Sequence, residues 1–231
     1  MHDPGLAIAL YVVFVFSVTF HEAAHAFVAM RGGDLTAYHG GQVSLSPLPH
    51  MRREPFGMLV LPILSVLLSG WPFGYASAPY DPVWAEAHPR RAAWMALAGP
   101  AANLLLVLVA GIAIRAGLAA GLFHAPERVY FSQVAVSDVS PLASSLALLL
   151  SVLFSMNLLL AVLNLIPVPP LDGAGALPLL LSDETARRFR AFGRSGLAWV
   201  GILLAWRLLD LVFDPIFLFL VNALYPHVQY G

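Results

Sequence analysis

The sequence has 231 residues, of which 59% are hydrophobic and only 11% carry a charge, and its formal net charge is −1. Since a soluble globular domain has about 25% charged residues, this composition predicts a membrane protein with several spanning helices. The balanced charge gives no indication of a nucleic-acid partner. The sequence has no cysteine, which excludes disulfide bonds and thiolate ligands, so any metal ion must be held by His, Asp or Glu.

The first apolar run, Gly5–Met30, is long enough to cross a bilayer as a helix that rises about 1.5 Å per residue. Toward its end it contains His21, Glu22 and His25. Ionisable side chains at membrane depth cost about 2.5–3.5 kcal/mol each on insertion scales, so by default they indicate a functional site.

The spacing of these three residues is the His-Glu-x-x-His pattern of zinc metallopeptidases. Histidines four positions apart lie on one face of a helix, with Cβ atoms about 5–6 Å apart, so both imidazoles can bind one zinc ion. Glu22, beside His21, flanks that ion and can take a proton from a zinc-bound water. The alternative is a chance match on an ordinary helix, which the cost of placing these groups in an apolar segment disfavours.

The chain after the first span is polar and rich in turn residues up to Glu54. Within it, Gln42–Ser46 alternates with period two, which predicts a short strand of a small β-hairpin. Such a strand either clamps an extended substrate by its edge or is a plain surface hairpin. The next apolar run, Phe56–Trp71, has roughly 16 residues and stops at Pro72, which is short for a span. It predicts a re-entrant or interfacial segment.

Two further runs without charges, Ala92–Ile114 and Leu142–Leu165, predict spanning helices. The first contains Asn103, an amide that either joins helices by a hydrogen bond or faces the reaction centre, where it can donate to an oxyanion. After the second run three prolines stop the helix, and Asp172 follows at once. We predict Asp172 as the third metal ligand; capping of a short helix over Gly173–Leu181 is the alternative or additional role.

The three expected ligands set the topology. Asp172 meets His21 and His25 only if their helices run parallel, which requires an even number of crossings between the two motifs. The two long apolar runs supply these crossings, so the short run at Phe56–Trp71 must either enter the membrane and return or lie in the interface. Positively charged loops stay in the cytoplasm, so the arginines predict that the site opens toward the cytoplasm. Nine of the twelve lie on the motif side: Arg31, Arg52, Arg53, Arg90, Arg91, Arg187, Arg188, Arg190 and Arg194.

Taken together, these residues resemble the site-2 protease family of intramembrane zinc metallopeptidases. His21–His25 matches the zinc-binding helix of that family, Asn164–Gly173 resembles its second motif, and Ala98–Asn103 resembles a further signature. Leu45–His50 and Pro72–Ala76 resemble segments of a compact subgroup without PDZ or CBS domains.

The resemblance implies one zinc ion per chain, held by His21, His25 and Asp172, with Glu22 as the general base. Asn164 matches a family asparagine associated with the active site and is a second candidate donor to the oxyanion. The implied function is the hydrolysis of peptide bonds in transmembrane segments of other proteins, inside the bilayer.

We therefore expect an all-α polytopic membrane protein: a transmembrane helix bundle with a short re-entrant or interfacial segment and a small β-hairpin near the active site. We expect one domain over residues 1–231, with a catalytic core at about 5–175 and a helical region at 176–231. The expected partners are a transmembrane protein substrate and the lipid bilayer, in the plasma membrane, without nucleic acid; the oligomeric state stays open.

Two other functions stay open. One is a membrane zinc hydrolase of another amphiphilic substrate. The other is a non-catalytic protein with a structural metal, which usually has four protein ligands. His39, His50 and His88 are the histidines available as a fourth ligand.

Overall fold

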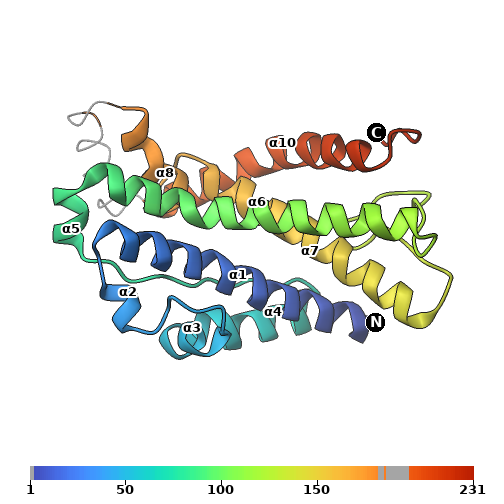
Figure 1. The fold of residues 1–231 in the computed structure, drawn as a ribbon, viewed down its shortest axis with the longest axis horizontal. Helices are drawn as coiled ribbons and strands as arrows, with labels where there is room; N and C mark the ends of the chain where they lie inside the picture. Colours follow the sequence, from blue (N-terminus) through green and yellow to red (C-terminus); the bar gives the residue numbers. More distant parts are fainter. Residues whose placement is uncertain (1–2, 182–184, 186–197) are drawn as a thin grey trace.

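The computed structural model describes residues 3–181, 185 and 198–231, and within the last helix it leaves out the side chains at 198–200, 202 and 210. Three long helices form its centre: α1 (Pro4–Gly32), α6 (Pro89–Ala119) and α7 (Pro141–Leu165). In the described part of the chain, these three are long and apolar enough to cross a membrane. They coincide with the three predicted spans and extend beyond them, and α6 packs against both α1 and α7 (Figure 1).

The ends of these helices follow from local sequence. α1 and α7 each begin with a proline after a capping side chain: Asp3 accepts a hydrogen bond from the backbone N of Gly5 at 2.8 Å, and Ser140 from that of Ala143 at 3.2 Å. These bonds satisfy donors that the start of a helix leaves free. α7 ends at Leu165, and the prolines that follow cannot continue the helix.

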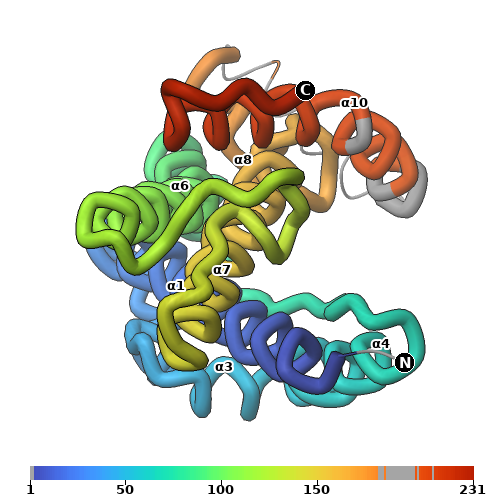
Figure 2. Tube along the Cα trace, turned by 90° about the vertical axis from the view of Figure 1, so that its right-hand side faces the viewer, coloured from blue at the N-terminus to red at the C-terminus, as the bar shows by residue number. Residues whose placement is uncertain are grey.

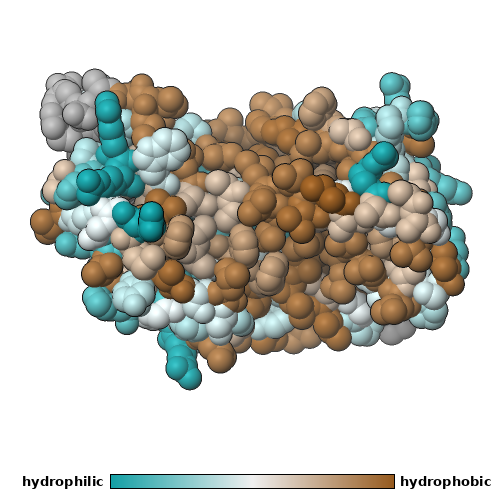
Figure 3. Space-filling model, viewed as in Figure 1, coloured by the Kyte–Doolittle hydropathy of each residue, from teal (hydrophilic) through white to brown (hydrophobic). Residues whose placement is uncertain are grey.

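The long helices give the molecule an apolar belt. Figure 3 shows hydrophobic residues across its middle and hydrophilic residues gathered toward its two ends. The 25 residues of α7 span about 37 Å, more than the roughly 30 Å of a hydrocarbon core. Large side chains that would be costly to expose to water lie on the outside, among them Val12, Leu104, Leu108, Ile112 and Leu142. The protein is therefore a membrane protein.

The directions of the long helices agree with the predicted topology. The C-terminal ends of α1 and α7 lie at the same end of the molecule as the short helices α5 (Pro82–Ala87) and α8 (Asp172–Ala176), while both chain termini lie at the opposite end (Figure 1). α6, which lies between α1 and α7 in the sequence, runs in the opposite direction to both. Two crossings therefore separate the first motif from the second.

The short apolar run, Phe56–Trp71, forms a helical part, after which the chain reverses its direction. A π-helical turn at Phe56–Val60 continues into α4 (Leu61–Ser69), and an extended segment over residues 70–81 then leads back to α5 beside α1 (Figure 1). The helical part, Phe56–Ser69, covers only about 21 Å, too little for a span. Where the chain returns, the backbone N of Tyr75 donates to the carbonyl of Gly57 at 3.1 Å.

The predicted β-hairpin at Gln42–Ser46 is wrong. The part of the chain that the structure describes has no strand there: residues 42–46 form bends between α2 (Thr36–His39) and α3 (Pro47–Arg53). The only β-type pairing among the described residues is two isolated bridges in the α6–α7 connection. Instead of joining a strand, Gln42 turns inward, 2% exposed, and its amide donates to the carbonyl of Ser77 at 3.2 Å.

The described residues after Asp172 are mostly helical, and part of the predicted helical region 176–231 lies outside the described residues. After α8 and a single 3₁₀ turn at Leu177–Leu179, the described chain resumes in α10 (Ala198–Leu224), which covers α6 and α7 on the side away from α1 (Figure 2). Phe217 and Val221 of α10 are buried in one apolar cluster with Phe154 of α7. Pro215 lies inside α10, and Figure 2 shows the helix changing direction along its length.

Asp34 ties the loop after α1 to the extended segment, and its removal is expected to destabilise the fold. Its carboxylate is 4% exposed and accepts from the N and Oγ1 of Thr36 at 2.9 and 2.6 Å and from the N of Asp81 at 2.8 Å. Replacing Asp34 with alanine leaves these donors unpaired, so we expect the free energy of unfolding in detergent to fall by about 1–3 kcal/mol. Asp138→Ala is the control, because that side chain is 92% exposed.

The same contacts set a pH dependence. Burial raises the pKa of Asp34, but the hydrogen bonds from Thr36 and Asp81 outweigh it and hold the pKa below its usual value. Because the pKa of Asp34 is lower in the folded state, the ionised carboxylate contributes to the free energy of unfolding. This contribution is complete above the unfolded-state pKa of about 4 and is lost as the pH falls through the folded-state pKa. The stability difference between wild type and Asp34→Asn should therefore shrink in acid. Equal melting of wild type and Asp34→Ala at neutral pH would contradict this role.

Candidate metal centre

Side chains from two distant parts of the chain converge at the centre of the molecule. The Nε2 atoms of His21 and His25, both on α1, lie 2.9 Å apart. The Oδ2 atom of Asp172, at the start of α8, lies 3.0 Å from the first and 3.3 Å from the second. Asp172 does not cap α8, because its helix has no side-chain capping bond. The carboxylate faces the imidazoles instead, and the capping alternative is wrong.

The other nitrogen of each imidazole is also engaged. Nδ1 of His25 lies 2.7 Å from the backbone carbonyl of Met95, and Nδ1 of His21 lies 2.6 Å from Oδ1 of Asn103, both on α6. An oxygen acceptor at Nδ1 fixes the proton there, which leaves a lone pair on Nε2. Such a hydrogen bond behind the ligating nitrogen is the usual support of a metal-binding histidine.

This donor set fits a divalent metal. Two Nε2 lone pairs and a carboxylate oxygen repel one another at 2.9–3.3 Å unless positive charge lies between them. Four ligands placed tetrahedrally at about 2.0–2.1 Å from zinc are about 3.3 Å apart, close to the spacing found. Oδ2 of Asp172 is buried without a hydrogen-bond partner among the described residues, which a cation would supply. Two nitrogens and one oxygen suit zinc.

Two glycines create the room for this convergence. A Cβ atom on Gly99 of α6 would overlap Nε2 of both His21 and His25. A Cβ atom on Gly173 would overlap the carbonyl oxygen of Leu165 at the end of α7. Gly99 therefore lets α6 approach the imidazoles, and Gly173 lets the residue after Asp172 pack against the preceding helix.

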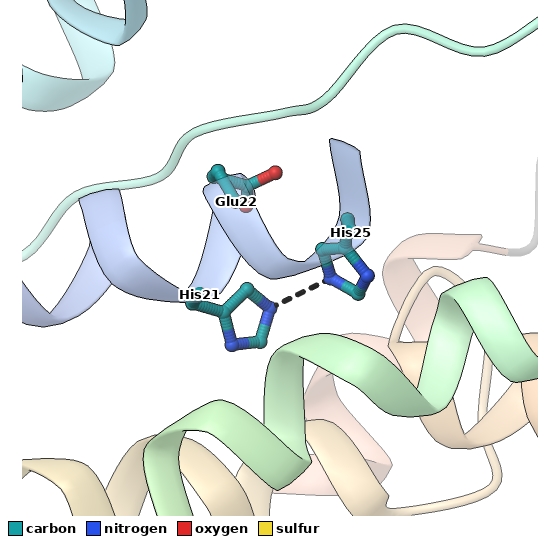
Figure 4. A group of neighbouring side chains, drawn as sticks. All are labelled: His21, Glu22 and His25. Atoms are coloured by element: carbon teal, nitrogen blue, oxygen red, sulfur yellow. Dashed lines mark hydrogen bonds between the residues drawn. The ribbon is translucent and has the colours of Figure 1, made fainter. Parts of the chain in front are cut away.

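Glu22 lies beside the ligand atoms rather than among them. Figure 4 shows the two imidazoles facing each other on one side of α1, and the Glu22 carboxylate on another side, toward the extended segment. Glu22 is 6% exposed, and its carboxylate lies within 4.8 Å of ligand nitrogens of both histidines. It borders a cavity of about 690 Å³ that His25, Asp172 and the extended residues 76–78 and Tyr80 also line.

The centre lies deep along the helices. His21 is about 16 Å from the end of α1 at Gly32, and Gly99 is about 15 Å from the start of α6 at Pro89, at about 1.5 Å per residue. Both distances place the ligand atoms within the apolar belt rather than at its surface. The cavity connects this depth with the end of the molecule that carries α5.

The two predicted asparagines do not line the cavity. Asn103 is 0% exposed; its Nδ2 donates to Oδ1 of Asn157 at 2.8 Å and its Oδ1 lies 2.6 Å from Nδ1 of His21, so it joins α6 to both α7 and α1. Asn164 is half-buried, and its Nδ2 donates to the carbonyl of Leu160 at 2.9 Å. None of these contacts supports donation to an oxyanion, and a role for Asn164 stays a prediction.

No third histidine joins His21 and His25 in the described part of the chain, where the compact group of possible metal-ligating side chains comprises these two histidines and Glu22. His50 is buried elsewhere, with Nε2 at 3.0 Å from the carbonyl of Ser44, and Nδ1 of His88 lies 3.2 Å from the carbonyl of Trp84. With His21, His25 and Asp172 as its ligands, a tetrahedral ion would keep one position for water, as catalytic zinc sites do.

Comparisons with known proteins agree with this site. The family model described as Peptidase family M50 matches residues 9–208. Rip2 of Mycolicibacterium smegmatis, a predicted zinc metalloprotease by its name, is 31% identical over 200 residues, which are 87% of this chain and 68% of the relative. YwhC of Bacillus subtilis, named in the same way, is 30% identical over 165 residues, 71% of this chain and 65% of the relative.

Rip2 of Mycobacterium tuberculosis is 32% identical over 183 residues, 79% of this chain and 61% of the relative. The chain thus spans about two thirds of the length of these relatives. A comparison with solved structures found no match. The extent of the family match and the identity to the first relative lead to one conclusion: the chain belongs to peptidase family M50 and is a membrane zinc metalloprotease.

Proposed function

We propose that the protein hydrolyses peptide bonds within transmembrane segments of other membrane proteins. His21, His25 and Asp172 would hold one zinc ion, and Glu22 would act as the general base. The observation that carries this proposal is the depth of the two imidazoles: His21 lies about 16 Å from the end of α1, and Gly99, which faces both imidazoles, lies about 15 Å from the start of α6. A peptide bond reaches that depth most readily as part of a membrane-embedded segment.

The chemistry divides between the metal and the chain. When bound, zinc supplies a Lewis acid that polarises the scissile carbonyl and lowers the pKa of a water at the open position. Glu22 takes a proton from the attacking water, holds it on its carboxylate within the cavity and passes it to the departing amine nitrogen. The largely buried position of Glu22 keeps bulk water away from this transfer.

The extended segment is suited to hold the substrate. A helix bonds its own peptide groups internally, so a transmembrane substrate must unwind locally before its carbonyl is attacked. Residues 76–78 and Tyr80 line the cavity in an extended conformation, and Ser77 is fixed from two sides. Its carbonyl accepts from Gln42, and its hydroxyl donates to Glu54 at 2.6 Å. An unwound substrate could pair with this segment as an added strand, the role first predicted for Gln42–Ser46.

We propose that the protein lies in the plasma membrane with its site open toward the cytoplasm, and arginine placement supports the cytoplasmic side. Five of the nine arginines of the motif side lie in the described chain, on or next to α1, α3 and α6 at the end that carries the cavity. Excess arginine marks cytoplasmic loops. The other four lie outside the described residues: Arg187, Arg188, Arg190 and Arg194.

The proposal is tested with purified zinc-loaded protein in lipid vesicles that also contain a single-pass protein with an apolar segment of about 20 residues. We expect mass spectrometry to find a cut within the apolar segment. A chelator should abolish the cut, and added zinc should restore it. Cuts confined to the water-exposed parts, or hydrolysis of vesicle lipids without any peptide cleavage, would contradict the proposal.

A further inference from the structure

The two imidazoles at the metal centre are oriented in different ways. Nδ1 of His25 lies 2.7 Å from the backbone carbonyl of Met95, which can only accept, so the proton must be on Nδ1. Nδ1 of His21 lies 2.6 Å from the side chain of Asn103, which carries both an acceptor and a donor. Only the oxygen of that amide puts the proton on Nδ1 and leaves Nε2 free for a metal.

A second asparagine decides which way Asn103 faces. Nδ2 of Asn157, on α7, donates to the carbonyl of Leu153 at 2.8 Å and to Oγ of Ser17 at 2.9 Å. Because a carbonyl only accepts, Asn157 must turn its nitrogen toward Leu153 and its oxygen toward Asn103. Asn103 must then donate to Asn157, at 2.8 Å, and present its own oxygen to His21.

The polarity of this chain of hydrogen bonds is therefore fixed by a backbone group and not by the metal. Asn103, Asn157 and Ser17 are each 0% exposed, so bulk water does not reach them to replace a missing partner. These hydrogen bonds connect α7 through α6 to α1, and each of the two amides has one orientation that satisfies all its neighbours. A reversed amide at Asn103 would leave a proton on Nε2 of His21 and remove that nitrogen as a ligand.

We propose that Asn157 is a positioning residue for the metal centre: it sets the tautomer of His21 through Asn103, although its own hydrogen bonds go to Asn103, Ser17 and Leu153. The inference rests on the proposed ligand set. It assigns a function to a polar group that lies on the predicted span Leu142–Leu165 and is not part of any sequence motif described above.

The test measures zinc affinity of the purified protein in detergent by competition with a chromophoric chelator. In Asn157→Leu the acceptor for Asn103 is lost, and we expect zinc to bind about 10–100-fold more weakly, as when other supporting partners of metal ligands are removed. The visible absorption bands of the cobalt-substituted protein should also change, because the coordination of His21 is perturbed. Asn157→Asp should restore both, since a buried neutral acid donates to Leu153 and accepts from Asn103.

Ser17→Ala is the matched control. It removes a buried hydrogen bond of the same network but leaves the carbonyl of Leu153 to orient Asn157, so zinc affinity and the cobalt spectrum should match the wild type. Helical circular dichroism of the zinc-free variants checks folding. If Asn157→Leu does not fold, Asn157→Ala replaces it, because it removes the same acceptor.

Three results would overturn the inference. The first is a folded Asn157→Leu or Asn157→Ala variant with wild-type zinc affinity and cobalt spectrum. The others are a Ser17→Ala variant that binds zinc as weakly as these variants, or an Asn157→Asp variant that restores neither the zinc affinity nor the spectrum. His21→Ala is measured in parallel. If His21→Ala binds zinc as tightly as the wild type, the proposed ligand set is wrong. If Asn157→Leu binds zinc as tightly as the wild type and His21→Ala does not, the ligand set stands and the role of Asn157 is wrong.

Discussion

Replacing Gly99 with alanine is expected to abolish zinc binding and proteolysis while leaving the helices folded. The added Cβ would overlap Nε2 of both His21 and His25, and neither imidazole can withdraw without losing its hydrogen bond to Asn103 or Met95. Zinc affinity should fall by at least about 100-fold, because both nitrogen ligands are displaced together. Chelator competition measures the loss, and circular dichroism measures helix content.

Gly111 on the same helix provides the control. Its Cβ would meet Leu224 at 3.5 Å and Phe154 at 3.6 Å, which are ordinary contacts, so Gly111→Ala should keep zinc and activity. Alanine also favours a helix over glycine by roughly 0.5–1 kcal/mol, so neither substitution weakens the helix itself. Normal zinc binding by Gly99→Ala would show that α6 does not approach the imidazoles as closely as the structure has it.

Replacing Glu22 with glutamine is expected to reduce kcat by about 10²–10⁴-fold, the range for loss of a general base, with zinc affinity unchanged. Glutamine keeps the size of the side chain but cannot take a proton from water. The carboxylate lies on a different side of α1 from the imidazoles, so its loss does not empty a ligand position (Figure 4). Cleavage of a model transmembrane substrate gives kcat and KM, and chelator competition gives the zinc affinity.

Asp172→Asn is the contrasting variant. Its carboxylate lies 3.0 and 3.3 Å from the two imidazole nitrogens, so this change should weaken zinc binding and thereby activity. Zinc loss in Glu22→Gln equal to that in Asp172→Asn would make Glu22 a fourth ligand and the metal a structural one. Undiminished cleavage by Glu22→Gln would refute the base assignment directly.

The convergence of the predicted ligands could be foreseen because most of the pattern is local in the sequence. His21, Glu22 and His25 lie within one turn and a half of one helix, where spacing alone fixes their mutual position. Asp172 is far away in sequence, but a helix-stopping run of prolines placed it at the end of a span, and counting crossings brought it to the same depth. The crossing count and the short length of Phe56–Trp71 together predicted that this segment is re-entrant or interfacial.

What failed or was missed depends on contacts between distant segments. Five alternating residues at Gln42–Ser46 resemble a strand, but period two over so short a stretch also arises when one side chain turns inward to reach a far loop. For Asn103 the sequence showed a polar group in an apolar helix without showing its direction. Asn157 gave the same signal on Leu142–Leu165, and its role emerges only when three helices are packed together.

The ligands also have an order in synthesis. His21 and His25 are made with the first helix, whereas Asp172 is made only after the residues of α6 and α7. A nascent chain that ends before Asp172 therefore carries the two imidazoles without the carboxylate that faces both of them in the folded protein. Translation has to pass through both later spans before all three side chains exist in one molecule.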